Sequence, residues 1–280
     1  MDVEVEEASP GETRAKTLIW LWIFLCLSIA ASWTVWLWPL HKQGSLFIAI
    51  LGWRLDVPFI LVKLVIGNCV PGIIAIVFAS REKEQLRHML SSLARWRVPF
   101  KWYLFSVILA CGVFWVCLGA VLFYLPTRHP SPSPLAFLRV FLMTLPFGPL
   151  FEELAWRAYA LTKLQAHYRR LPSALFLGVY WAVWHIPLWL VTLNLRLSIG
   201  ILVLVMASIN LVAWSVIFAF VYNRSAQSLP VVICLHASYV AASTSVFAAV
   251  PHAHLYLIGF SAVVSVCVAA TLASLNHESV

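Results

Sequence analysis

The sequence has little charge, and only one pair of acidic residues lies in its long central part. Only 11% of the 280 residues are Asp, Glu, Lys or Arg, whereas a soluble globular domain has about 25%. Hydrophobic residues make up 62% of the chain. A chain of this composition cannot cover itself with a water-soluble surface, which excludes a soluble enzyme or a soluble binding module.

Several familiar catalytic and metal-binding motifs are also absent. The chain has no CxxC pair, no HExxH zinc motif and no GxSxG nucleophile elbow. Its six cysteines all lie inside apolar runs: Cys26, Cys69, Cys111, Cys117, Cys234 and Cys267. We interpret them as small buried apolar side chains rather than as disulfides or metal ligands.

What the sequence does contain is a series of long apolar runs. Spanning the hydrocarbon core of a bilayer takes about 20 mostly apolar residues. The runs that fit are 17–40, 57–80, 100–125, 135–163, 173–193, 198–222, 228–248 and 253–275. The sequence therefore predicts an all-α, polytopic membrane protein with about eight transmembrane helices. We expect a short cytoplasmic tail over residues 1–16, one transmembrane domain over residues 17–275, and a re-entrant or interfacial piece at 46–53.

Basic residues are distributed unevenly between the two ends of the predicted helices. Twelve belong to one end: Arg14, Lys16, Arg81, Lys83, Arg87, Arg95, Arg97, Lys101, Lys163, Arg169, Arg170 and Arg224. Four belong to the other: Lys42, Arg54, Arg128 and Arg196. Because cytoplasmic loops carry the excess of Lys and Arg, we expect both termini in the cytoplasm. The net charge of +8 then indicates contacts with lipid headgroups rather than with nucleic acid.

Two adjacent glutamates lie in the middle of the fourth predicted span. Glu152 and Glu153 are the only acidic residues between Glu84 and Glu278. A charged residue at the centre of a membrane helix costs at least ~2.5–3.5 kcal/mol and usually faces the bundle interior. Glu153 and Arg157 are four residues apart, so a structural ion pair explains one of the two glutamates. Glu152 points about 100° away from Glu153 around the helix axis, so this ion pair does not explain it. We therefore expect Glu152 to have a functional role.

Two histidines lie at a similar depth in other predicted spans. His185 follows Trp181 by one helical turn in the fifth span, and His236 lies in the seventh. A lone buried histidine is more often structural. However, Glu152, His185 and His236 are each 8–12 residues from the cytoplasmic end of their span, about 12–18 Å from that face. We interpret them as one intramembrane site enclosed by the helices, with Trp181 in support.

The residue types of this site favour hydrolysis of an amide. A buried carboxylate suits a general base that activates water. Imidazoles can share the proton or donate hydrogen bonds to a developing oxyanion.

These residues also form recognisable motifs. Residues 152–161, EELAWRAYAL, have the spacing EExxxR, and residues 181–187, WAVWHIP, fit FxxxH and its variant WxxWHxP. His236 fits the first position of HxxxN. In these motifs the chain resembles the CAAX protease and bacteriocin-processing family, intramembrane glutamic endopeptidases that include the Ras-converting prenyl endopeptidase. The resemblance extends from about Asn68 to Val240.

The resemblance implies a role for each motif residue. Glu152 would activate water together with His185, His236 would help to hold the oxyanion, and Glu153 and Arg157 would brace the site. A glutamate-based mechanism of this kind uses no metal and no cofactor.

The sequence departs from the third motif at Val240, where the family has Asn. Asn68 and Asn210 are the candidate replacements, because each lies twelve residues from the cytoplasmic end of its predicted span. The mild changes Ala155 and Ala158 replace glycines that are common in bacterial members.

We therefore expect an intramembrane peptidase with its site open to the cytoplasmic side, in the plasma membrane of a prokaryote. Its partners would be membrane lipids and a peptide or protein substrate, lipidated or not, with no nucleic acid. Prenylated C-terminal peptides, leader peptides and bacteriocins all fit as substrates.

The main alternative is a catalytically weak or inactive membrane scaffold or regulatory protein on the same fold, which Val240 favours. A transporter would show Gly/Pro-broken helices in repeated halves, and a metal-dependent hydrolase would show a ligand-spacing motif. Neither feature is present in the sequence.

Overall fold

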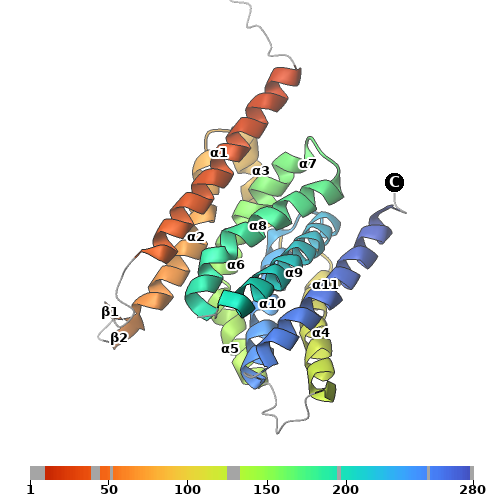
Figure 1. The fold of residues 1–280 in the computed structure, drawn as a ribbon. Helices are drawn as coiled ribbons and strands as arrows, with labels where there is room; N and C mark the ends of the chain where they lie inside the picture. Colours follow the sequence, from red (N-terminus) through yellow and green to blue (C-terminus); the bar gives the residue numbers. More distant parts are fainter. Residues whose placement is uncertain are drawn as a thin grey trace, which may run out of the picture.

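The protein is described by a computed structural model in which the placed residues are 10–38, 45–50, 53–124, 133–193, 197–250 and 253–277. These residues form a bundle of helices with one small β-hairpin beside it (Figure 1). In chain order the elements are α1 (Pro10–Leu37), β1 (Ser45–Ile50), β2 (Trp53–Pro58), α2 (Phe59–Ala79), α3 (Lys83–Ala94), α4 (Lys101–Tyr124), α5 (Pro134–Thr144), α6 (Gly148–Glu153), the π-helix η1 (Leu154–Leu161), α7 (Thr162–Gln165), α8 (Arg170–Leu193), α9 (Leu197–Arg224), α10 (Leu229–Ala249) and α11 (His254–His277).

Within the described residues, seven helices are long and apolar enough to cross a membrane. An eighth crossing results when α5 and the helical series α6–η1–α7 are counted as one span, which is bent by 50° at their junction. These spans confirm the prediction of an all-α polytopic membrane protein. α1 begins at Pro10, so part of the expected tail is helical, and residues 1–9 lie outside the described part.

The bend in the fourth span has a local cause in the sequence. Pro146 and Pro149 flank Gly148 at the junction, and proline has no backbone N–H to donate to the preceding turn. α5 therefore ends at Thr144, and a new helix starts at Gly148 with Pro149 in its first turn. The sequence predicted one continuous span here, and the structure divides it just before the paired glutamates.

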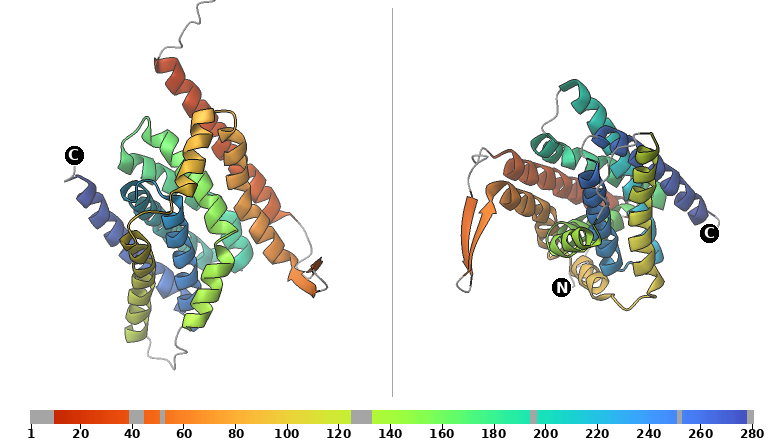
Figure 2. Two further views of the ribbon diagram at one scale, coloured as in Figure 1. Left: turned by 180° about the vertical axis from the view of Figure 1, so that it is seen from behind. Right: turned by 90° about the horizontal axis from the view of Figure 1, so that it is seen from below.

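The described part of the segment expected to be re-entrant or interfacial, 46–53, belongs to an antiparallel hairpin. Ser45 pairs with Pro58 at its open end, and Ile50 pairs with Trp53 at its turn. The turned views show the hairpin projecting away from the helices (Figure 2). It lies at the end of the bundle opposite to α3 and α7 (Figure 1).

The end of the bundle that holds α3 and α7 also holds the start of α1 and the end of α11 (Figure 1). The basic loops 81–101 and 163–172 lie at this end, which we call the basic end. The sequence prediction that these loops share one side is thus consistent with the arrangement of the helices.

Two glycines allow helices to approach closely around the centre of the bundle. A Cβ on Gly72 of α2 would lie 2.5 Å from the backbone oxygen of Phe151, so α2 packs directly on the backbone of α6. A Cβ on Gly178 of α8 would lie 2.8 Å from the Cα of Val212 in α9. Small residues at such contacts are typical of membrane helix packing, and the first contact places α2 beside the glutamates.

All six cysteines lie in the described residues and none forms a disulfide. Only Cys117 is buried, whereas Cys26 and Cys267 are exposed on the helix surface. The expectation of buried side chains is therefore wrong for these two, because the outer surface of a membrane bundle is itself apolar and accepts a small thiol.

Candidate active site

The paired glutamates lie where the fourth span changes from an α-helix to a π-helix. They are the last two residues of α6, and the eight residues of η1 that follow are all buried. Glu152 is 3% exposed and Glu153 is fully buried. A π-helix closes i→i+5 hydrogen bonds, is rare, and is frequently found at functional sites. The 3.6-residue period assumed from the sequence therefore does not continue beyond Glu153.

Glu153 contacts two charged or polar partners. Its Oε2 lies 3.1 Å from Nε of Arg157, and its Oε1 accepts hydrogen bonds from Nη1 of Arg157 at 3.2 Å and Nδ1 of His236 at 2.7 Å. The guanidinium of Arg157, 1% exposed, also lies over the rings of Trp181 and Phe218, with its Cζ 5.0 and 4.3 Å from their centroids. The ion pair expected from the sequence is present, and Glu153 acts as an anchor between η1 and α10.

Glu152 has a different environment. Its Oε2 accepts a hydrogen bond from the indole Nε1 of Trp181 at 3.0 Å. In the part of the chain that the structure describes, no ion pair includes Glu152. The buried carboxylate is therefore held in position by a neutral donor and keeps free lone pairs for another ligand.

Both candidate histidines use Nδ1 for binding to the protein. Nδ1 of His185 lies 2.9 Å from the backbone oxygen of Trp181, and a carbonyl can only accept, so this nitrogen carries the proton. Nδ1 of His236 donates to the carboxylate of Glu153. In each ring Nε2 is left to face another partner. His185 is within electrostatic range of both Glu152 and His236.

Trp181 connects these groups. It donates to Glu152 through its indole nitrogen and accepts from His185 through its carbonyl oxygen. Its ring also packs edge-on against the ring of His236, with centroids 5.7 Å apart. The structure thus brings together Glu152, Glu153, Arg157, Trp181, His185 and His236, all of which were selected from the sequence.

Asn210 is hydrogen-bonded at both ends of its side-chain amide. Its Nδ2 donates to the hydroxyl of Tyr239 at 3.0 Å, and its Oδ1 accepts from the hydroxyl of Ser265 at 2.9 Å. Both ends of the side chain are therefore used to join α9, α10 and α11.

Asn68 lies in different surroundings. Its Nδ2 and Oε1 of Glu152 each lie 3.5 Å from the position that a Cβ would take on Gly148. The absent side chain of Gly148 thus leaves room between the amide and the carboxylate. Oδ1 of Asn68 is buried, and among the described residues it has no hydrogen-bond partner.

Three further residues near the site were not selected from the sequence. They are Phe218, which covers Arg157, Gly148, which separates Asn68 from Glu152, and Cys69, whose Sγ lies 3.7 Å from the backbone oxygen of Phe147. Of these three, only Gly148 could have been noticed in the sequence, because it lies one helical turn before Glu152. Val240 lies one turn after His236 on α10 and is half-buried.

Metal ligation is not apparent in the arrangement of the side chains. Across the ranges that the structure describes, no group of three or more His, Cys, Asp or Glu residues is placed to hold a metal ion.

Comparison with known proteins shows which family part of this chain resembles. Residues 133–242 match the family described as Type II CAAX prenyl endopeptidase Rce1-like. This part of the chain is similar to the Rce1-like family. The matched region contains the charged cluster, by which we mean Glu152, Glu153, Arg157, His185 and His236, and it also contains Trp181 and Asn210. Asn68 lies outside it.

A curated relative matches a shorter segment. It is "CAAX prenyl protease 2" from Methanococcus maripaludis, which is 40% identical over 47 residues. The aligned segment covers 17% of this chain and 17% of the relative. The resemblance stated from the sequence motifs is thus confirmed at the level of the family.

Proposed function

We propose that the protein is an intramembrane peptidase in which Glu152 activates water. The observation that supports this role is the contrast between the two glutamates. Glu153 is neutralised by Arg157 and bonded to His236, whereas among the described residues Glu152 has only the indole of Trp181. A buried carboxylate without a counter-ion lowers the free energy of unfolding. Ionisable residues within membrane segments commonly have a role in function.

The reaction follows from the free atoms of the site. Glu152 takes a proton from water, and the resulting hydroxide attacks the carbonyl carbon of the substrate peptide bond. The tetrahedral oxyanion collapses as the C–N bond breaks, and the proton held by Glu152 passes to the leaving amine. Nε2 of His185 orients the water, since Nδ1 of this ring is fixed by Trp181. A proton on Nε2 of His236 would face the oxyanion, with Glu153 balancing the charge.

Asn68 is the residue that we assign as the second oxyanion donor. The amide lies across Gly148 from Glu152, and its own oxygen is otherwise unpaired. A carbonyl group placed between Asn68 and Glu152 would have a donor on one side and the activated water on the other. Asn210 does not meet this requirement, because its amide is already bonded to Tyr239.

We further propose that the site opens to the basic end and that this end is cytoplasmic. The substrate would be a peptide or protein segment that reaches the membrane. The name of the relative, CAAX prenyl protease 2, makes prenylated C-terminal peptides the first substrate class to test, followed by leader peptides and bacteriocin precursors.

A cleavage assay on the purified protein tests this proposal. Wild type and Glu152→Ala are compared on a library of prenylated and unmodified peptides, with and without EDTA. Cleavage by wild type alone, unchanged by EDTA, is the expected result. Loss of activity with EDTA that zinc restores would assign the chemistry to a metal instead.

The competing candidate is a membrane scaffold on the same fold, favoured by Val240 in place of the motif Asn. It predicts that wild type and Glu152→Ala bind the same partner protein and that neither cleaves any peptide in the library.

A further inference from the structure

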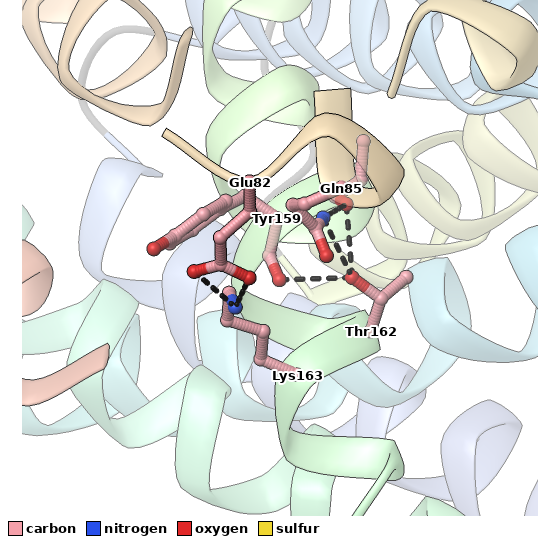
Figure 3. Close-up of polar contacts among 6 residues, drawn as sticks. Glu82, Gln85, Tyr159, Thr162 and Lys163 are labelled. Carbon is pink, nitrogen blue, oxygen red and sulfur yellow. Dashed lines mark hydrogen bonds and ion pairs between the residues drawn. The ribbon is translucent and has the colours of Figure 1, made fainter. Parts of the chain in front are cut away.

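The π-helix next to the glutamates is held from outside the transmembrane bundle by a residue of α3. Nε2 of Gln85 donates to the backbone oxygen of Ala158 at 2.8 Å and lies 3.4 Å from the hydroxyl of Thr162 (Figure 3). The same hydroxyl donates to the backbone oxygens of Ala158 and Tyr159, at 2.9 Å each. These side-chain donors stabilise a carbonyl in the middle of a rare type of helix.

A second contact fixes the end of this π-helix. Nζ of Lys163 lies 2.7 and 3.0 Å from the two carboxylate oxygens of Glu82, the residue before α3 (Figure 3). The side chain of Lys163 is 7% exposed, whereas that of Glu82 is 47% exposed. The Glu82 and Gln85 contacts together hold residues 158–163 in one position relative to α3.

The geometry of a π-helix makes this anchoring relevant to catalysis. An i→i+5 turn contains more residues than an i→i+4 turn. If η1 relaxed to an α-helix, the residues before it would therefore rotate about the helix axis relative to the residues after it. With Lys163 anchored to Glu82, the groups that rotate are Glu152 and Glu153, which lie directly before η1.

The other end of α3 contacts the turn that leads into α10. Nε2 of His88 lies 3.3 Å from Oε1 of Gln227, and the guanidinium of Arg95 donates to the backbone oxygen of Ala226. Ala226 and Gln227 have positive φ values of 56° and 59°, an uncommon conformation for non-glycine residues. α3 therefore bonds both to η1 and to the turn before the helix that carries His236.

We propose that α3 is a positioning brace for the candidate active site, with Gln85 as its main positioning residue. The brace keeps η1 in its π register and holds α10 beside it, so that Glu152 faces Trp181 and Glu153 meets His236. The inference rests on the proposed function for its catalytic consequence. Its structural part stands separately and has its own readout.

The test uses two variants of Gln85 in the full-length protein in detergent. Gln85→Met keeps the length of the side chain and removes the donor, whereas Gln85→Lys restores a donor. Glu84→Gln is the matched control, because Glu84 is on the same helix and its side chain, 86% exposed, pairs with the exposed Arg87. Hydrogen exchange of peptides covering 154–165 and labelling of Glu152 by a hydrophobic carbodiimide are measured by mass spectrometry.

We expect faster exchange and several-fold more labelling of Glu152 in Gln85→Met, and wild-type values in Gln85→Lys and Glu84→Gln. With a cleavable peptide, kcat should fall ~10–100-fold in Gln85→Met while KM stays within about twofold, because misplacement of a catalytic group affects the chemical step.

Each outcome decides one of the two proposals. Unchanged exchange and labelling in Gln85→Met overturn the brace, whether or not the protein cleaves peptides. Faster exchange with unchanged labelling and unchanged kcat shows that α3 does not position Glu152, which also overturns it. Absence of cleavage by wild type overturns the proposed function, and the labelling of Glu152 then still decides whether α3 positions this residue.

Discussion

At the scale of single residues, Glu152 and Glu153 have the same side chain but different contacts. Glu153 binds Arg157 and His236, and in the part of the chain that is described Glu152 binds only Trp181. The first arrangement is that of a structural anchor, because a carboxylate neutralised by Arg157 and bonded to His236 has little capacity left for substrate. The second leaves the carboxylate free for the role of general base that we propose. Substitutions at the two positions should therefore have different consequences.

Glu152→Gln should abolish turnover and leave a folded protein, because the amide keeps the size of the side chain but cannot take a proton from water. His185→Ala and His236→Ala should have the same effect on turnover, with a loss of at least ~10²-fold each. The measurements are peptide cleavage and thermal unfolding, with the exposed Glu84→Gln as control. Full activity in Glu152→Gln would remove the proposed role of this residue.

Arg157→Ala should lower stability rather than act on the chemical step alone. The change leaves Glu153 as a buried charge with only His236 as its partner, and breaking a buried ion pair typically costs about 3–5 kcal/mol. The matched control is Arg87→Ala, whose pair with Glu84 is exposed. Denaturation curves in one detergent should show a large loss for the first variant and almost none for the second.

The replacement of the motif Asn by Val240 can be tested by a double substitution. Asn68→Leu should reduce kcat by ~10²–10³, the usual loss for one oxyanion donor. Val240→Asn should have little effect in wild type and should restore part of the rate in Asn68→Leu. Asn210→Leu, the control, should mainly reduce stability, because its amide joins helices α9, α10 and α11. If Asn68→Leu cleaves normally, Asn68 is not the donor.

At the scale of the elements, the position of the site depends on how closely α2 approaches α6. Gly72 makes this approach possible, since a Cβ there would lie 2.5 Å from the backbone of Phe151. Backbone cannot move aside as a flexible side chain can. Asn68 lies one turn earlier on α2, and Glu152 directly follows Phe151 on α6, so the same contact sets the separation of these two side chains.

Gly72→Ala should therefore destabilise the protein by about 1–3 kcal/mol, as overpacking does, and should reduce turnover as well. Gly112→Ala and Gly119→Ala on α4 are matched controls, because a Cβ at either position meets no atom within 4 Å. Alanine is the better helix former there, so these two variants should be as stable as wild type or more stable in thermal unfolding. Equal stability of all three would contradict the proposed contact.

At the scale of the whole molecule, the start of α1 and the end of α11 lie at the same end of the bundle (Figure 1), so we expect both termini on one side of the membrane. Reporter fusions at Val280 and within residues 127–134 should report opposite sides, with the C-terminal fusion in the cytoplasm. The physical reason is the excess of basic residues at the basic end. Fusions that report the same side would contradict a bundle of eight crossings.

The sequence by itself determined the class of fold, the approximate spans and the members of the charged cluster. The thickness of a bilayer sets a minimum length for apolar runs, so hydropathy alone located α1, α2, α4 and α8 to α11. Charged residues are rare in membrane segments, so Glu152, Glu153 and Arg157 were conspicuous without any structure. The ion pair of Glu153 followed from spacing along one helix.

Only the tertiary structure decided how these residues are used. The π-helix after Glu153 is held by long-range contacts with α2 and α3, which cannot be read from the local sequence. Two asparagines had the same predicted depth, and only packing distinguishes Asn68, beside Gly148 and Glu152, from Asn210, bonded to Tyr239 and Ser265. The physical reason is that depth along a helix is set by local sequence, whereas the direction a side chain faces is set by the helices packed around it.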